Sequence, residues 1–208
     1  MPRNGVPMTT LLSARFDEAL AFASQVHRLQ IRKGGTIPYI AHLLAVTALV
    51  LENGGDEDTA IAALLHDTVE DQGGLPMLER VRAAFGPRVA AIVMEVSDNE
   101  GDPKPPWKAR KEQFIASIPG LSPEARLIAL ADKLHNVRST IDEFRRVGEV
   151  VWTRFHGRRD GTLWYYREVL GALQAPRMDA LVTNEPLFLE LTRAIKELFV
   201  LAGEPLPA

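Results

Sequence analysis

Apolar positions recur at helical spacing along most of this chain, and no segment shows the strict alternation typical of a strand. Phe16 and Leu20 belong to a first stripe, in a helix that we expect to be capped by Thr9 or Thr10 and to end near His27. Further helices are expected over 39–53, 56–72, 76–85, 87–96, 123–138, 150–166 and 178–201. The pattern predicts an all-α fold.

Local signals set several of these boundaries. Asp56 and Ser122 are expected N-caps, and a proline at the first helical position follows Ser122. Gly86-Pro87 is typical of one helix giving way to the next. The stretch 97–106 has the composition of a loop, and it leads into a short basic segment that contains Lys104 and Lys111.

The composition narrows the class of protein. The 208 residues are 46% hydrophobic and 25% charged, which predicts one soluble domain over 1–208 with a core at about 10–200. The net charge of −3 argues against a nucleic-acid-coating surface. With no cysteine, no signal peptide and no long apolar run, we expect no thiolate chemistry, no membrane span and a cytoplasmic location. The sequence leaves a homo-oligomer open.

One stretch, 64–71, ends an apolar helical run with a histidine and three acids. His66 and Glu70 are four residues apart, as are Asp67 and Asp71, so each pair would share a helix face. Burying acids without partners costs several kcal/mol each. A divalent cation would offset that cost most simply.

Two further helices offer potential ligands from apolar surroundings. His42, His66, Asp67 and Asp132 together would make a mixed nitrogen and oxygen site, which suits Mn, Fe or Mg. Such a metal would lower the pKa of a bound water for attack on phosphorus. Glu70 and Asp71, one turn on, would accept the proton of that water or protonate a leaving group.

The order histidine, histidine-aspartate, aspartate resembles the HD phosphohydrolase superfamily. Longer segments are similar to the hydrolase domain of RelA/SpoT homologues, and the chain resembles a stand-alone small alarmone hydrolase of that family. The resemblance implies an HD-domain helical bundle. The matching segments are His27-x-x-Gln30-x-Arg32-Lys33, Pro38-Tyr39-Ile40-x-His42, Ala63 to Asp71, Phe85-Gly86 and Leu130 to Arg138.

The resemblance also implies an activity, namely hydrolysis of the 3′-pyrophosphate of (p)ppGpp-type alarmones with Mn²⁺ or another divalent metal. By motif match, His42, His66, Asp67 and Asp132 would be ligands, and Glu70 and Asp71 the catalytic acids. Arg32 and Lys33 match a basic pair beside the nucleotide, and Asn136 matches a residue near base and ribose. A polyphosphate substrate needs cations. Further candidates for substrate contact are Tyr39, Lys104, Lys111 and Arg138.

Several alternatives stay open at this point. A nucleotide or NADPH phosphatase would use the same metal site, whereas an inactive alarmone sensor would be expected to lack one of these six groups. The sequence does not separate guanine from adenine alarmones. His27 and His135 are candidates for substrate contact, for helix packing or for support of a metal ligand. Lys133 is expected to point away from the metal, although its side chain could reach a phosphate. His156 is expected on the surface, and the core is expected to hold Trp152, Trp164, Tyr165 and Tyr166.

Overall fold

The structure is a computed structural model that describes residues 11–97, 105–174 and 185–207. Regular structure within these ranges is helical, and β-structure there is limited to an isolated bridge between Ile31 and Pro38. The expected all-α fold is confirmed. The helices are α1 (Ala14–Val26), α2 (Ile40–Glu52), α3 (Glu57–Leu65), α4 (Thr68–Gln72), α5 (Gly74–Phe85), α6 (Pro87–Val96), α7 (Trp107–Ser117), η1 (Ile118–Gly120), α8 (Pro123–Val147), η2 (Gly148–Arg154), α9 (Arg158–Gln174) and α10 (Glu185–Leu201).

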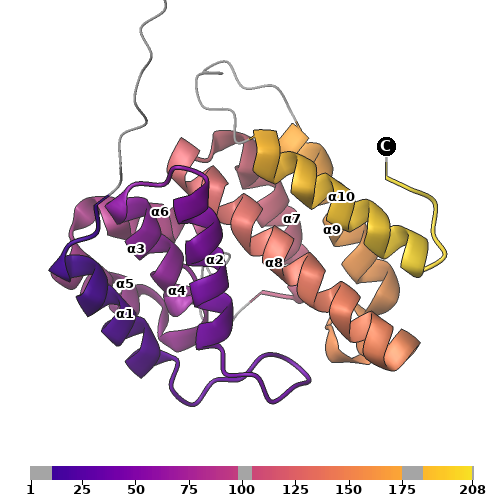
Figure 1. Ribbon diagram of the computed structural model, residues 1–208, viewed down its shortest axis with the longest axis horizontal. Helices are drawn as coiled ribbons and strands as arrows, with labels where there is room; N and C mark the ends of the chain where they lie inside the picture. The colour runs from indigo at the N-terminus through magenta and orange to yellow at the C-terminus, as the bar shows by residue number, and fades with distance from the viewer. Residues whose placement is uncertain (1–10, 98–104, 175–184, 208) are drawn as a thin grey trace, which may run out of the picture.

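Helix α3 lies at the centre of the N-terminal half, where α1, α2, α6 and α8 pack around it (Figure 1). Every residue from Thr59 to Leu65 is buried, and Glu57 and Asp58, in the first turn of the helix, are partly exposed. A helix that is apolar all round belongs in a core. Its C-terminal end therefore delivers His66 and Asp67 into the interior of the protein.

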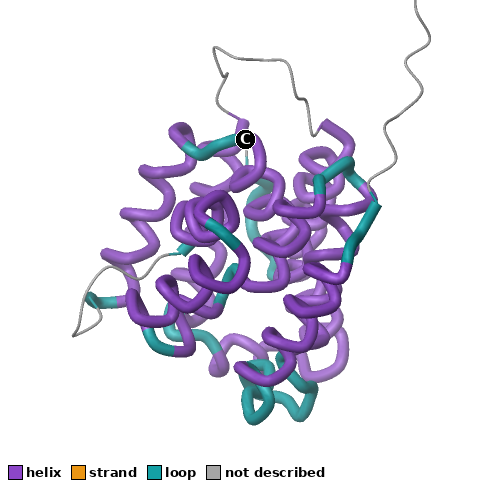
Figure 2. The backbone as a smooth tube through the Cα atoms, turned by 90° about the vertical axis from the view of Figure 1, so that its left-hand side faces the viewer, coloured by secondary structure: helices purple, strands orange, loops and turns teal. Residues whose placement is uncertain are grey.

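Helix α8 joins the two halves of the molecule. It packs against α2, α3 and α6 on one side and against α10 and η2 on the other (Figure 1). Short loops connect most of the helices (Figure 2). In the part of the chain that the structure describes, no helix is long and apolar enough to cross a membrane.

Several predicted boundaries are confirmed at atomic detail. The Asp56 side chain accepts a hydrogen bond from the backbone N–H of Thr59 at 2.9 Å, which caps α3. Ser122 caps α8 in the same way, accepting from Ala125 N at 3.2 Å. Gly86 takes φ +93°, a conformation that favours glycine, and Pro87 then begins α6.

The predicted start of the first helix was wrong. Helix α1 begins at Ala14 with Ser13 as its N-cap, and Leu11, which precedes the helix, is 81% exposed. The backbone N–H of Ser13 donates to Glu57 on α3, which fixes the chain at this point. Thr9 and Thr10 lie outside the described residues, as do the first seven positions of the helix expected over 178–201.

The prediction of one continuous helix over 56–72 was also wrong, because the helix breaks at His66 and Asp67. Two side chains donate hydrogen bonds to backbone carbonyls that would accept from backbone N–H groups in a continuous helix. His66 Nδ1 donates to the Ala63 carbonyl at 2.8 Å, and Thr68 Oγ1 donates to the Leu65 carbonyl at 2.6 Å. The break turns His66 and Asp67 to face the same side of the core.

The helix expected over 150–166 is divided as well. The 3₁₀ helix η2 ends at Arg154, and α9 begins only at Arg158, which has a positive φ of 52°. Residues 155–157 form the turn between them. Apolar spacing alone did not reveal this turn, because both flanking helices continue the pattern of buried residues.

Loss of the α3 cap gives a stability prediction. Asp56→Ala is expected to lower the free energy of unfolding by about 1–2 kcal/mol at pH 7. Burial opposes ionisation of Asp56, but hydrogen bonds from Thr59 and Arg88 lower its pKa. Because the folded pKa is depressed, the contribution is present above about pH 4 and is lost as the pH falls through the folded value. Urea unfolding at pH 7 and pH 3 measures both effects.

The control for this prediction is Asp56→Asn, which keeps an acceptor for the Thr59 N–H but removes the charge that faces Arg88. It is expected to cost less than Asp56→Ala. An alanine variant with the stability of the parent protein at pH 7 would contradict the capping role.

Candidate active site

Four side chains from α2, the α3–α4 break and α8 converge in the interior. Ligand atoms of His42, His66 and Asp67 all lie within 4.8 Å of one another. Asp132 Oδ1 lies 3.2 Å from His42 Nε2 and 3.8 Å from His66 Nε2. The four residues that the sequence singled out as metal ligands therefore meet at one point, close enough to share an ion.

The two imidazoles are oriented for a cation. His42 Nε2 and His66 Nε2 are buried, and neither has a hydrogen-bond partner in the described part of the chain. Since a carbonyl can only accept, His66 must carry its proton on Nδ1, where it donates to Ala63. Its Nε2 lone pair then faces the carboxylates. Orphaned nitrogen lone pairs beside two acids fit a divalent metal.

The charges around this point favour a positive ion. Burial lowers the pKa of the His66 imidazole, but Asp67 and Asp132 offset this and raise that pKa well above its ordinary value. Burial likewise disfavours both carboxylates, yet the neighbouring cationic and histidine groups hold their pKa values well below the usual range. Positive charge at His66 or a bound cation satisfies the same requirement.

His135, whose role the sequence left open, is the partner of His42. The two Nδ1 atoms lie 2.8 Å apart. Burial, with His42 and Arg32 nearby, lowers the pKa of His135 to about 4, so it is neutral at pH 7. If Nε2 of His42 binds a metal, its Nδ1–H donates to the His135 lone pair and the ring is held in place.

This contact predicts a loss of metal affinity in His135→Ala. We expect Mn²⁺ binding to weaken by about tenfold or more, the usual effect of removing a hydrogen-bond partner of a ligand histidine. Calorimetric titration of the metal-free protein measures it. His156→Ala is the matched control, since His156 is exposed, as the sequence predicted. Equal affinities in both variants would contradict this role.

Asp132 is held from two sides. The Asn136 side-chain N–H donates to its Oδ1, and the Asn136 oxygen accepts from Arg32 Nη2 at 2.7 Å. Lys133 Nζ lies 2.5 Å from the other carboxylate oxygen, Oδ2. A chain of polar contacts thus crosses the site from Arg32 to Lys133. Contrary to the prediction, the Lys133 ammonium points toward the candidate metal centre.

Tyr39 is tied to the same cluster. Its hydroxyl donates to Asp67 Oδ2 at 2.6 Å, and the Arg32 guanidinium lies 5.7 Å from the centre of its ring. The His27 ring stacks on Tyr39 at 5.4 Å, and its Nδ1 shares a hydrogen bond with Gln30 Oε1. Tyr39 therefore orients Asp67, and its ring borders the position of Arg32.

Glu70 and Asp71, the two acids that follow His66 and Asp67, face different surroundings. Glu70 lines the pocket beside His66 and Asp67, and Arg110 Nη1 lies 3.0 Å from its Oε1. Asp71 is exposed, and its Oδ2 accepts from Gln30 Nε2 at 2.7 Å. Glu70 is the better placed of the two for contact with a ligand in the pocket.

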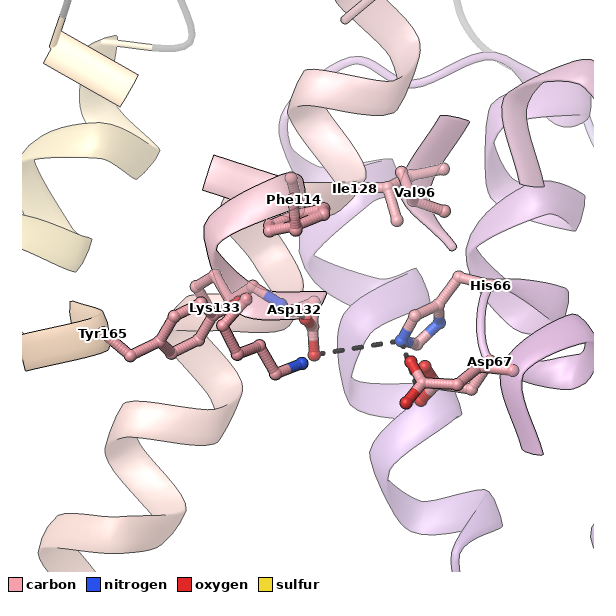
Figure 3. Close-up of a pocket in the computed structure, with 11 residues that line it drawn as sticks. His66, Asp67, Val96, Phe114, Ile128, Asp132, Lys133 and Tyr165 are labelled. Atoms are coloured by element: carbon pink, nitrogen blue, oxygen red, sulfur yellow. Dashed lines mark hydrogen bonds and ion pairs between the residues drawn. The ribbon is translucent and has the colours of Figure 1, made fainter. Parts of the chain in front are cut away.

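A pocket opens beside the four candidate metal ligands, and residues of α7, α8 and α9 line much of it. Lys133 lies next to Asp132 on one side, and His66 and Asp67 lie on the other (Figure 3). Its lining residues are His66, Asp67, Glu70, Val96, Lys111, Phe114, Ile128, Ala129, Asp132, Lys133 and Tyr165. The pocket combines acids near the cluster with two lysines and an apolar back wall.

Not every residue expected to touch substrate is brought to this region. Arg138 pairs with Glu190 of α10 at 2.7 Å, on an exposed face. Lys33 is exposed in the turn next to Arg32, and Lys104 lies outside the described residues. Arg32, Asn136 and Lys111 do adjoin the cluster or line the pocket.

Sequence reasoning missed two members of the pocket wall. Tyr165 was expected to be a core aromatic, and it is buried, but it also lines the pocket. Lys133 was expected to face away from the metal, with a phosphate still within its reach. Its position directly after a ligand candidate was a usable signal, because a long flexible stem lets its ammonium return to the same carboxylate.

A family profile described as "HD domain" matches residues 19–163, which include all four members of the cluster. The chain belongs to the HD-domain family. The expected resemblance to RelA/SpoT-type hydrolases is confirmed by the relatives of this HD domain. Mouse MESH1, named guanosine-3′,5′-bis(diphosphate) 3′-pyrophosphohydrolase, is 37% identical over 90% of this chain and 94% of its own length.

Two further comparisons agree. Human MESH1, with the same name, is 42% identical over 61% of this chain and 69% of its own length. A solved structure described as a metazoan orthologue of SpoT that hydrolyses ppGpp and acts in starvation responses is 32% identical. It superposes with a TM-score of 0.73 and covers 93% of this chain and 98% of its own. This HD domain is therefore similar to alarmone hydrolases over nearly its whole length.

Proposed function

We propose that this protein hydrolyses the 3′-pyrophosphate of a purine alarmone of the ppGpp or ppApp type. The observation that carries the proposal is the convergence of His42, His66, Asp67 and Asp132 on one point beside a pocket with lysines. The similarity to ppGpp hydrolases over most of the chain supports the substrate class. We assign Mn²⁺ to the site because the resemblance to alarmone hydrolases implies it, and the mixed donor set of two imidazoles and two carboxylates is compatible with Mn²⁺ as well as with Fe²⁺ or Mg²⁺.

A divalent cation held by these four residues would supply Lewis-acid activation of water and of a phosphate oxygen. Glu70 lies beside them in the pocket, and we assign it the proton that leaves the attacking water. The new bond joins the water oxygen to the 3′-linked phosphorus, and the bond from that phosphorus to the 3′ oxygen breaks. The 3′ oxygen takes up a proton, so ppGpp and water give GDP and pyrophosphate.

The remaining groups would hold the nucleoside. The Arg32 guanidinium lies over the Tyr39 ring and donates a hydrogen bond to the Asn136 side chain. These two contacts fix a planar cation beside the four candidate metal ligands. A guanidinium in this position can stack on a purine or pair with a phosphate. The hydrogen bond from the Gln30 side chain to Asp71 keeps the turn that carries Arg32 close to α4.

The test of this function is product analysis on ppGpp, ppApp and NADPH, each with Mn²⁺ and each with a chelator. We expect pyrophosphate together with GDP or ADP, and no product after chelation. Orthophosphate from NADPH alone would replace the alarmone assignment with a phosphatase. Binding of ppGpp without turnover would replace it with a sensor.

A further inference from the structure

Lys133 is a buried cation on the wall of the pocket. Its side chain is 13% exposed, and its ammonium lies 2.5 Å from Asp132 Oδ2 while also facing the rings of Phe114 and Tyr165 at 4.8 and 5.7 Å. Asp132 Oδ1 faces the histidines. The two oxygens of the Asp132 carboxylate therefore have different neighbours: Oδ1 faces the candidate metal position, and Oδ2 contacts the Lys133 ammonium. The ammonium must lie close to any ion held there.

Two neighbours extend this wall. Lys111 lines the same pocket, with its ammonium 5.3 Å from the centre of the Tyr165 ring. The Tyr165 hydroxyl, in a residue only 8% exposed, faces the Lys133 ammonium, which can only donate to it. The hydroxyl proton therefore still needs an acceptor, which an oxyanion in the pocket would supply.

Helix α7, which carries Lys111, is seated firmly. The Trp107 ring lies on Gly157 and Gly161, so close that a Cβ added at Gly157 would come within 2.5 Å of it. Arg110, one residue before Lys111, pairs with Glu70 across the pocket. Lys111 is thus held beside the pocket by contacts at both the start and the middle of the helix.

We propose that Lys133, Lys111 and Tyr165 form a subsite for the pyrophosphate group that is cut from the substrate. Two ammonium groups and one hydroxyl give cationic and donor contacts suited to a multiply charged oxyanion. The adjacent apolar wall, which includes Phe114 and Ile128, keeps water from screening these charges. This inference rests on the proposed function and specifies which wall holds the leaving group.

The geometry favours the 3′-pyrophosphate over the 5′-diphosphate of the same substrate. The phosphorus under attack must lie at the ligand cluster, and Lys133 is bonded to a member of that cluster. The next phosphate of the 3′-pyrophosphate would then lie within reach of Lys133. Arg32 and Asn136 stand at the other end of the polar chain that runs through Asp132 to Lys133.

The test is calorimetric titration of inorganic pyrophosphate and, separately, of GDP into the Mn²⁺-loaded protein at fixed free Mn²⁺. We expect Lys111→Met and Lys133→Met each to weaken pyrophosphate binding by about tenfold or more, and Tyr165→Phe by a few fold, with GDP binding unchanged. Lys133→Arg is expected to restore part of the loss. Lys108→Met is the matched control, because Lys108 lies on α7 over Trp164 and is 61% exposed.

Each outcome bears on the subsite. Mn²⁺ affinity is measured in every variant, because Lys133 also touches Asp132, whereas Lys111→Met and Tyr165→Phe leave that carboxylate untouched. Pyrophosphate binding equal to that of Lys108→Met in both of these variants would overturn the proposal, as would weakening of GDP binding alone. Because binding is measured without turnover, a protein that binds pyrophosphate here but leaves ppGpp intact would contradict only the proposed function.

Discussion

Replacing His66 by alanine is expected to lower the rate of pyrophosphate release by about three orders of magnitude or more, equivalent to about 4 kcal/mol of transition-state stabilisation. His66 supplies a buried lone pair that has no other partner in the described part of the chain, and it directly follows helix α3, whose residues 59–65 are all buried. Its loss leaves Asp67 and Asp132 facing each other with one imidazole fewer. Steady-state kinetics with Mn²⁺ and metal titration both measure the effect.

The control for His66→Ala is His156→Ala, which removes an exposed imidazole from the turn before α9 and is expected to keep full activity. Circular dichroism checks that both variants remain helical. A His66→Ala protein that binds Mn²⁺ as tightly as the parent and retains more than a tenth of its rate would refute the metal centre as described.

Glu70→Gln is expected to reduce the rate by about a hundredfold to ten-thousandfold, the range typical of losing a general acid or base. The amide keeps the size of the side chain and an acceptor for Arg110, but it cannot take a proton from water. Mn²⁺ affinity is expected to change little, because the four ligand candidates are untouched. The two measurements together separate proton transfer from metal binding.

Glu112→Gln is the matched control, since Glu112 is 55% exposed on α7 and pairs only with Lys108 among the contacts described for it. An unchanged rate in Glu70→Gln would assign the proton to another group, with Asp71 the first to examine.

The sequence predicted the parts of the fold that depend on local chemistry. The caps at Asp56 and Ser122 and the Gly86-Pro87 boundary follow from backbone hydrogen bonding that neighbouring residues decide. The cluster also followed from the sequence, because polar groups within or directly after apolar helical segments must find partners in the core. Their convergence at 3–4 Å is what that reasoning requires.

The errors lie where tertiary contacts decide. The break at His66 depends on side chains capturing the Ala63 and Leu65 carbonyls, which periodicity does not reveal. Long side chains gave the other surprises: Arg138 reaches α10, and Lys133 turns back to Asp132. The direction of a flexible stem depends on the partner that the fold brings near it.

The most direct test of the central claim is hydrolysis of ppGpp in H₂¹⁸O with Mn²⁺, followed by mass spectrometry of the products. If water attacks the 3′-linked phosphorus, the label enters pyrophosphate, and GDP carries none. Label in the 3′-hydroxyl of GDP would place the break at carbon, and labelled orthophosphate would place the attack at the terminal phosphate. Either result would contradict a pyrophosphohydrolase that acts at the 3′ phosphorus.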